Sequence, residues 1–255
     1  SFNGIDYKMP IASAQVKSAI LLAGLGAKNP SVVKELKHSR NHSEIMLESM
    51  GANIVVDDNN ITLNPLSSKL KSFNMDIPAD PSSAAFFIAL AALLKGSDLT
   101  VKNILLNPTR TGFIDVLGKM GVQGLVSNPM TNNGESCGDI QFIGSNIKSC
   151  DVPAHMIPSI IDEIPILAVI AAFAKGRTVF HQVEELRFKE SDRLDAIIQN
   201  LQSFGINAFE EKNNLIVDGG KPTKMAKIIS YDDHRIAMAF IILSLVAFKE
   251  FDIDN

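Results

Sequence analysis

Basic side chains gather at points where helices are expected to begin. Residues 187–194, RFKESDRL, hold five charges within seven positions and lead into an amphipathic helix. We expect Ser191 to cap that helix, which places Lys189 and Glu190 just before it and Arg193 in its first turn. A run of this kind is usually a solvated surface. The positive end of the helix dipole disfavours cations, however, so the chain gains from this placement mainly when an anion is bound.

A second group of polar residues, YDDHRI at 231–236, precedes a helix that is apolar to residue 248. Asp232 or Asp233 can cap this helix. His234 fits a structural hydrogen bond at least as well as a catalytic role. Arg235 is the stronger candidate, because a guanidinium group binds phosphate or carboxylate with paired donors.

Carboxylates and small polar residues make up two weaker groups. Asp162 and Glu163 stand at the start of a third apolar helix, where a carboxylate close to cations can serve as a general base. Residues 12–15, ASAQ, and the pair Ser39 and Arg40 supply hydroxyls, an amide and another cation. No glycine-rich nucleotide loop, nucleophile elbow, metal motif or redox motif is present. Together the groups indicate a small substrate with more than one phosphate or carboxylate.

The elements that must position these residues repeat along the chain. Short apolar helices end in LLAGLGAK, AALLKG, AAFAKG and LVAFKE, and a second, amphipathic helix follows each of the first three before a glycine. The unit reads strand, helix, strand, helix, strands over about 70 to 80 residues, which is too long for a solenoid repeat. Each of these apolar helices closes on a lysine, and the residue 13 positions earlier marks its expected beginning. These residues are Gln15, Ser82, Asp162 and Ile236, the last of which follows Arg235. Ser82 and Asp162 are expected as helix caps, and several helix N-termini could converge on an anion.

Composition limits the classes of protein that this chain can belong to. It has 255 residues, 46% hydrophobic and 20% charged, which supports a packed core rather than disorder. A net charge of −4 argues against nucleic acid or an anionic membrane as the main partner. Two cysteines without a CxxC pair support neither a disulfide scaffold nor a zinc site. Without a visible targeting segment or membrane span, we expect a cytoplasmic protein.

Several spaced motifs resemble those of the EPSP synthase family, the 3-phosphoshikimate 1-carboxyvinyltransferases. They are KESDR at 189–193, DHR at 233–235, NPTRTG at 107–112 and ASAQVKSA at 12–19. Asp80 with Ser82 and Ser83, and the Asp162–Glu163 pair, match in the same order. The resemblance covers essentially the whole chain. It implies an α/β (α+β) enolpyruvyl transferase fold, with repeated βαβαββ units forming two domains around an interdomain cleft.

The resemblance also implies a reaction and a set of residues for it. The enolpyruvyl group of phosphoenolpyruvate would pass to the 5-hydroxyl of shikimate 3-phosphate through a tetrahedral intermediate, with release of phosphate and without a cofactor or metal. The implied catalytic residues are Asp162, as the base toward the hydroxyl, Glu190, for proton transfer at the methylene carbon, and Lys189. Those implied for shikimate 3-phosphate are Ser13, Ala14, Gln15, Arg40, Asp162 and Lys189. Those implied for phosphoenolpyruvate are Gln15, Arg193 and Arg235.

Family segments that would carry further active-site motifs have no counterpart here. We therefore expect a fragment that lacks roughly the first third and a short carboxyl-terminal piece of the family's chain. Residues 1–76 would be part of the first domain and residues 77–255 most of the second, with the boundary near the proline-rich residues 76–81. The small-molecule substrates would be the partners of a monomer. The alternatives are an enzyme like UDP-N-acetylglucosamine enolpyruvyl transferase and a catalytically silent, ligand-binding fragment.

Overall fold

The computed structural model describes residues 2–144 and 146–254, which fall into two compact units. Unit 1 comprises Ser1–Pro78, Leu105–Thr109 and Pro129–Cys137. Unit 2 comprises Ala79–Ile104, Arg110–Asn128 and Gly138–Asn255. The main division therefore falls after Pro78, within the proline-rich segment. The chain after Pro78 also returns two short segments, Leu105–Thr109 and Pro129–Cys137, to unit 1, and local sequence patterns do not indicate this return.

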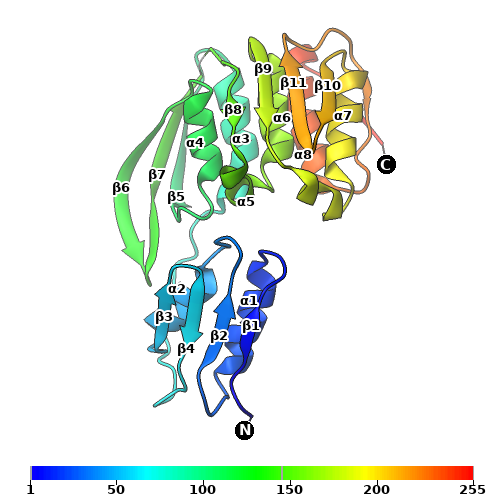
Figure 1. Cartoon of the computed structure of the whole chain (residues 1–255). Coiled ribbons are helices and arrows are strands. Elements are labelled where there is room, and N and C mark those ends of the chain that lie inside the picture. Colours follow the sequence, from blue (N-terminus) through cyan, green and yellow to red (C-terminus); the bar gives the residue numbers. More distant parts are fainter. Residues whose placement is uncertain (1, 145, 255) are drawn as a thin grey trace. The chain divides into compact units, whose positions relative to one another are not determined.

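Unit 1 contains one complete strand-helix-strand-helix-strand-strand repeat (Figure 1). Its elements are β1 (Asp6–Lys8), α1 (Ala14–Gly24), β2 (Ser31–Lys34), α2 (His42–Ser49), β3 (Ile54–Asp57) and β4 (Asn60–Leu63). The sheet order is β1-β2-β4-β3, with β1 and β2 parallel and the other neighbours antiparallel. The repeat predicted from the sequence is confirmed in this unit.

The next repeat begins at the start of unit 2. It contains α3 (Pro81–Leu93), β5 (Asp98–Leu105), α4 (Gly112–Lys119), β6 (Gly124–Asn132) and β7 (Glu135–Ile143). The strands are ordered β5-β7-β6, and a parallel bridge from Ala79 to Ile104 stands where β1 stands in the first repeat. The second repeat therefore has the same topology as the first, except that a single β-bridge replaces its first strand.

The third repeat has the sheet order of the first. It contains β8 (Asp151–Val152), α6 (Ile164–Phe173), β9 (Gly176–Phe180), α7 (Arg193–Ser203), β10 (Asn207–Glu211) and β11 (Asn214–Gly219), ordered β8-β9-β11-β10. Short helices η1 (Ala154–Met156), α5 (Ile157–Ile160) and η2 (Glu184–Phe188) lie in its loops. A half repeat follows, with α8 (His234–Phe248) joining the parallel strands β12 (Lys227–Ile228) and β13 (Asp252–Ile253).

The core of unit 2 is formed where α3, α6 and α8 pack against one another (Figure 1). Every residue of α6 from Ile164 to Ala172 is buried, as expected for a helix that is apolar on all sides. Burial of each large aliphatic side chain contributes roughly 1.5–3 kcal/mol, so these helices hold the repeats of unit 2 together. The helix in the same position of unit 1, α1, leaves Val16 and Leu22 exposed.

No single helix among the described residues is long and apolar enough to cross a membrane. The bent pair of helices 154–160 and 164–173 has the length and composition for it.

The helix caps differ in part from those predicted. Asp192, not Ser191, caps α7 and accepts a hydrogen bond from the backbone N–H of Asp195. Asp80, not Ser82, caps α3, and Glu163 rather than Asp162 occupies the N-cap position of α6. The prediction that Asp232 or Asp233 caps α8 is confirmed for Asp233. A carboxylate reaches the free N–H groups of a first turn as well as a hydroxyl does, and adds a favourable charge there.

We expect the replacement Asp139→Asn to reduce the loss of folding stability at low pH. The Asp139 carboxylate on β7 accepts hydrogen bonds from Lys102 Nζ at 2.8 Å, the Asn103 N–H at 2.9 Å and Asn128 Nδ2 at 2.9 Å. These contacts, led by Lys102, lower the pKa of Asp139 to about 2. An unfolded aspartate has a pKa of about 3.9. Its stabilisation is therefore complete above about pH 4 and is lost as the pH falls towards 2.

Melting temperatures measured from pH 7 to pH 2 test this expectation. Wild type should melt higher than Asp139→Asn at neutral pH, and the difference should close between about pH 4 and pH 2. Asp98→Asn is the matched control, because Asp98 lies on the neighbouring strand β5 and accepts its hydrogen bonds from the neutral Gln141. A difference between wild type and Asp139→Asn that is constant across this range would contradict the assignment.

Candidate active site

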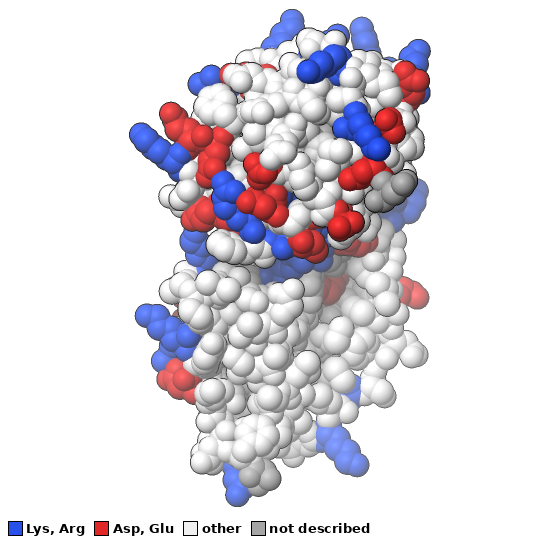
Figure 2. All heavy atoms as spheres, turned by 90° about the vertical axis from the view of Figure 1, so that its right-hand side faces the viewer, with Lys and Arg blue, Asp and Glu red and all other residues white. Residues whose placement is uncertain are grey.

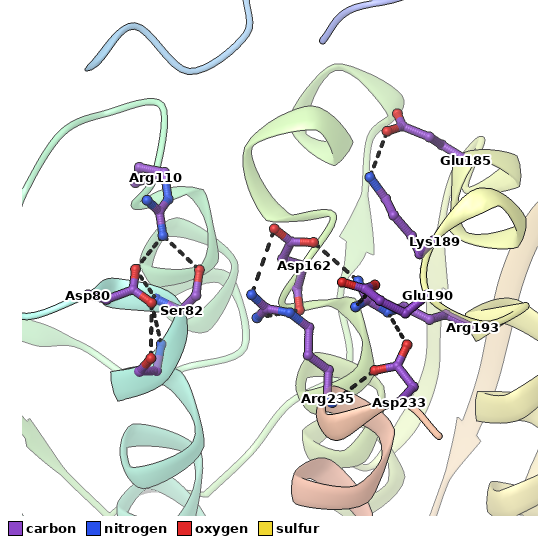
Figure 3. Close-up of polar contacts among 11 residues, drawn as sticks. Asp80, Ser82, Arg110, Asp162, Glu185, Lys189, Glu190, Arg193, Asp233 and Arg235 are labelled. Atoms are coloured by element: carbon purple, nitrogen blue, oxygen red, sulfur yellow. Dashed lines mark hydrogen bonds and ion pairs between the residues drawn. The ribbon is translucent and has the colours of Figure 1, made fainter. Parts of the chain in front are cut away.

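Arg193, the first residue of α7, is a fully buried cation surrounded by carboxylates (Figure 3). Its Nε donates to Asp233 Oδ2 at 2.8 Å, its Nη1 donates to Asp162 Oδ1 at 3.1 Å, and its Nη2 donates to Glu190. Burial disfavours the charged guanidinium, but the hydrogen bond and charge of Asp233, with Glu190 and Asp162, outweigh it and raise the pKa of Arg193. Arg193 is thus a permanent positive charge in a fixed orientation.

Asp233 connects the two arginines of this cluster. Its Oδ2 accepts from Arg193 and, at 3.2 Å, from Ser191 Oγ, while its Oδ1 accepts from the backbone N–H of Arg235 at 2.9 Å. Burial alone would raise the pKa of Asp233, but the hydrogen bond and charge of Arg193, helped by backbone N–H groups, lower it. The residue was expected only as a helix cap. Its second role has no local signal, because Arg193 stands 40 positions earlier in the chain.

Asp162 lies in the turn between α5 and α6, with both arginines on it (Figure 3). Arg193 donates to its Oδ1, and Arg235 Nη1 donates to its backbone oxygen at 3.3 Å. Arg235 Nη2 lies 3.9 Å from Asp162 Oδ2. The Asp162 side chain is 17% exposed, so this carboxylate is held by cations while part of it faces outward. The two guanidinium groups therefore fix the orientation of a carboxylate that is still partly exposed.

Lys189 and Glu190, between η2 and α7, are more accessible. Lys189 Nζ donates to Glu185 Oε1 at 2.9 Å, four residues earlier. The Glu190 side chain is 56% exposed although it pairs with Arg193. The structure therefore brings together Asp162, Glu190, Arg193 and Arg235, and places Lys189 beside Glu190 in the chain. His234 is exposed at the start of α8.

A further arginine, from the loop between β5 and α4, contacts the N-terminus of α3. Arg110 Nη2 donates to Ser82 Oγ at 2.9 Å and to Asp80, whose carboxylate also caps the helix (Figure 3). Burial raises the pKa of Asp80, but the charge of Arg110 and the hydrogen bonds to the carboxylate lower it overall. The motif at 107–112 and the residues at 80–83 were recognised in the sequence, but their partnership was not. The helix ends of α3, α7 and α8 in unit 2 thus each carry an arginine.

The remaining predicted ligands belong to unit 1. Ser13 caps α1, with its Oγ accepting from the Val16 N–H at 3.4 Å, and Ala14 and Gln15 are the first two residues of that helix. Arg40 lies in the loop between β2 and α2. Next to it, Asn41 Oδ1 accepts from Asn107 Nδ2 at 2.8 Å. Within unit 1, Ser13–Gln15 are therefore at a helix N-terminus, as the sequence predicts.

Figure 2 shows acidic and basic side chains interleaved over the visible face of unit 2, and few charged side chains over that of unit 1. No broad basic surface appears on this face. Among residues 2–144 and 146–254, no group of three or more His, Cys, Asp and Glu side chains is arranged to hold a metal ion. The arginines at the helix ends of unit 2 are of the type that binds small anions.

The model of the EPSP synthase (3-phosphoshikimate 1-carboxyvinyltransferase) family matches residues 1–255. The chain belongs to the EPSP synthase family. It is 47% identical over 243 residues to a 3-phosphoshikimate 1-carboxyvinyltransferase of Caldicellulosiruptor bescii, covering 94% of this chain and 56% of the relative. It is 42% identical over 255 residues to one of Oceanobacillus iheyensis, covering 100% of this chain and 59% of the relative. Both matches extend across the two units.

Solved EPSP synthase structures share the fold. One from Acinetobacter baumannii matches with a TM-score of 0.88 and 39% identity, covering 95% of this chain and 56% of that chain. The expectation of an α/β enolpyruvyl transferase fold is therefore confirmed. The chain spans little more than half the length of these EPSP synthase relatives.

Proposed function

We propose that this chain takes part in the EPSP synthase reaction, the transfer of the enolpyruvyl group of phosphoenolpyruvate to the 5-hydroxyl of shikimate 3-phosphate. The observation that carries the proposal is the placement of Asp162 between Arg193 and Arg235. One carboxylate next to two fixed guanidinium groups suits a reaction in which an alcohol loses a proton close to a bound anion. The family to which the chain belongs supports the same reaction.

In this proposal Arg193 and Arg235 hold the phosphoenolpyruvate anion with paired donors. Arg193 already uses its donors on Asp233, Asp162 and Glu190. The contact with the exposed Glu190 is the easiest to exchange, because that carboxylate can turn into water at little cost. Release of Glu190 would open one side of the guanidinium for the ligand and free the carboxylate for chemistry.

Formation of the tetrahedral intermediate needs two proton transfers. Asp162 takes the proton of the 5-hydroxyl as its oxygen bonds to C2 of phosphoenolpyruvate, while a proton is delivered to the methylene carbon, for which Glu190 is the candidate. The tetrahedral intermediate then loses phosphate from C2 and returns a proton from the new methyl group to Glu190, which restores the double bond, and the proton on Asp162 passes to the departing phosphate. Lys189, Arg193 and Arg235 offset negative charge along this path. No metal or cofactor is assigned a role.

The remaining predicted residues would bind shikimate 3-phosphate. We assign Ser13, Ala14 and Gln15 to contacts from the N-terminus of α1, where free N–H groups favour an anionic ligand. Arg40 would bind the phosphate group. Lys189 and Asp162, which belong to unit 2, are the other residues that we assign to this substrate.

Two measurements test the proposal. Calorimetric titration of the 255-residue chain with shikimate 3-phosphate, and then with phosphoenolpyruvate, should show binding that the second ligand strengthens. For turnover, we would replace the matching 243-residue stretch of the Caldicellulosiruptor bescii relative with this chain's residues and measure phosphate release. An active chimera supports the proposal. If the parent is active and a folded chimera is not, the residues of this chain lack the function.

The same assay separates the alternatives. A chimera that accepts UDP-N-acetylglucosamine instead of shikimate 3-phosphate would favour the related transferase activity. Binding without turnover in the chimera would favour a catalytically silent, ligand-binding chain.

We also propose that the protein is a cytoplasmic monomer. Both cysteines are free thiols, which suits a reducing compartment. Sedimentation of the chain at several concentrations tests the oligomeric state.

A further inference from the structure

Unit 1 buries a lysine that the proposed chemistry does not use. The Lys17 side chain, on α1, is 1% exposed and is among the largest fully buried side chains of the structure. Its Nζ lies 3.2 Å from Glu35 Oε2 and 2.6 Å from Glu44 Oε1. Both carboxylates are also buried, with 2% and 7% of their side chains exposed. An ion cluster removed from water this far is costly, and apolar side chains of similar volume would often serve stability as well.

The cluster joins three elements of unit 1. Lys17 belongs to α1, Glu35 follows the last residue of β2, and Glu44 lies in the first turn of α2. A second contact, 2.6 Å between Ser18 Oγ and Ser43 Oγ, links α1 to α2 beside it. One buried ammonium group thus fixes the beginning of α1 relative to the beginning of α2 and the loop between β2 and α2.

The network also extends into that loop. Ser39 Oγ donates to Glu35 Oε1, the carboxylate that pairs through its other oxygen with Lys17. Ser39 is next to Arg40, and Lys17 is two positions after Gln15. The two ends of the network therefore lie beside the two groups of unit 1 residues to which we assign shikimate 3-phosphate. A lysine needed for stability alone would not require a series of hydrogen bonds that ends at Ser39 in this loop.

We propose that Lys17 is a positioning residue, which, through Glu35 and Ser39, holds the Arg40 loop in register with the N-terminus of α1. This inference rests on the proposed function for its ligand, shikimate 3-phosphate. Because the ligand's phosphate and its ring must be held at the same time, a shift of about 1 Å between the two groups should cost much of the affinity. Lys17 itself does not touch the substrate.

The test compares three variants of the 255-residue chain. Lys17→Met removes the buried charge with little change in volume, and Ser39→Ala cuts only the loop end of the network. Lys34→Met is the matched control, because Lys34 lies on the adjacent strand β2 and forms a surface ion pair with Asp6, with side chains 44% and 62% exposed. Each variant is titrated with shikimate 3-phosphate, and its amide hydrogen exchange is followed by mass spectrometry.

We expect Lys17→Met to weaken binding by about tenfold to a hundredfold. Ser39→Ala should weaken it by about twofold to tenfold, which matches the loss of one hydrogen bond, and Lys34→Met should leave it unchanged. Exchange in both test variants should rise most over residues 35–41. A purely structural role would instead speed exchange throughout unit 1 in Lys17→Met and leave Ser39→Ala like wild type.

Two outcomes would overturn the inference. One is wild-type affinity in Ser39→Ala together with unchanged exchange at residues 35–41. The other is a Lys17→Met chain whose loop exchanges no faster than the rest of unit 1. If the wild-type chain does not bind shikimate 3-phosphate, the proposed function fails, and the exchange data still decide whether Lys17 positions the loop. A Lys17→Met chain that does not fold leaves the decision to Ser39→Ala.

Discussion

Replacing Arg193 with methionine should lower the free energy of unfolding by about 3–5 kcal/mol, the usual cost of removing one partner from a buried ion pair. The physical reason is Asp233. Both side chains are 0% exposed, and without the guanidinium the Asp233 carboxylate would be left buried with a charge that no longer has its main partner. Denaturant unfolding at neutral pH, followed by circular dichroism, measures the change.

Arg187→Met provides the matched control for this prediction. Arg187 lies six residues earlier in the same charged run and pairs with two carboxylates, Asp192 and Glu210, but its side chain is 36% exposed. Pairs at such a surface contribute about 0–1 kcal/mol, so this variant should unfold close to wild type. Equal losses in the two variants would show that Arg193 is not the buried centre of the cluster.

Arg193 also allows stability and ligand binding to be separated. Arg193→Lys keeps a positive charge but loses the planar fork that bonds three carboxylates at once. We expect it to retain more stability than Arg193→Met and still to lose most phosphoenolpyruvate binding. Wild-type affinity for both substrates in a folded Arg193→Lys or Arg193→Met chain would remove Arg193 from the proposed anion site.

Asp162→Asn should reduce the rate of phosphate release by about 10²–10⁴-fold, the typical contribution of a general base. Asparagine keeps the size of the side chain and can still accept from Arg193, but it cannot take the proton of the 5-hydroxyl. The change is measured in the chimera, with both substrates saturating, so that weaker binding does not enter the rate. A turnover number within a few-fold of the parent would exclude Asp162 as the base.

The control for Asp162 is another aspartate paired with an arginine. Asp218 on β11 accepts two hydrogen bonds from Arg177, at 2.6 and 2.9 Å, on a sheet surface of unit 2. Asp218→Asn breaks an ion pair of the same type without touching the cluster around Arg193. Its turnover should equal that of the parent chimera. A similar loss in both variants would trace the effect to stability.

Much of the fold and part of the candidate site could be predicted from the sequence. The uninterrupted apolar residues of α6 can only be satisfied by burial on all sides, and the recurring helix ends mark the repeats. The positions of Arg193 and Arg235 at helix starts followed from the same local patterns. These features depend on neighbours within one or two turns, which a sequence displays directly.

Only the tertiary structure decided which charged groups are partners. Asp233 lies 40 positions from Arg193, Arg110 lies 30 from Asp80, and Glu35 lies 18 from Lys17, and no local pattern connects them. The choice of Asp192 over Ser191 as the cap of α7 belongs here too, because Ser191 Oγ turns to Asp233 instead. The sequence by itself determined the repeats and the family. Long-range electrostatics, set by which elements pack together, determined how its charges are paired.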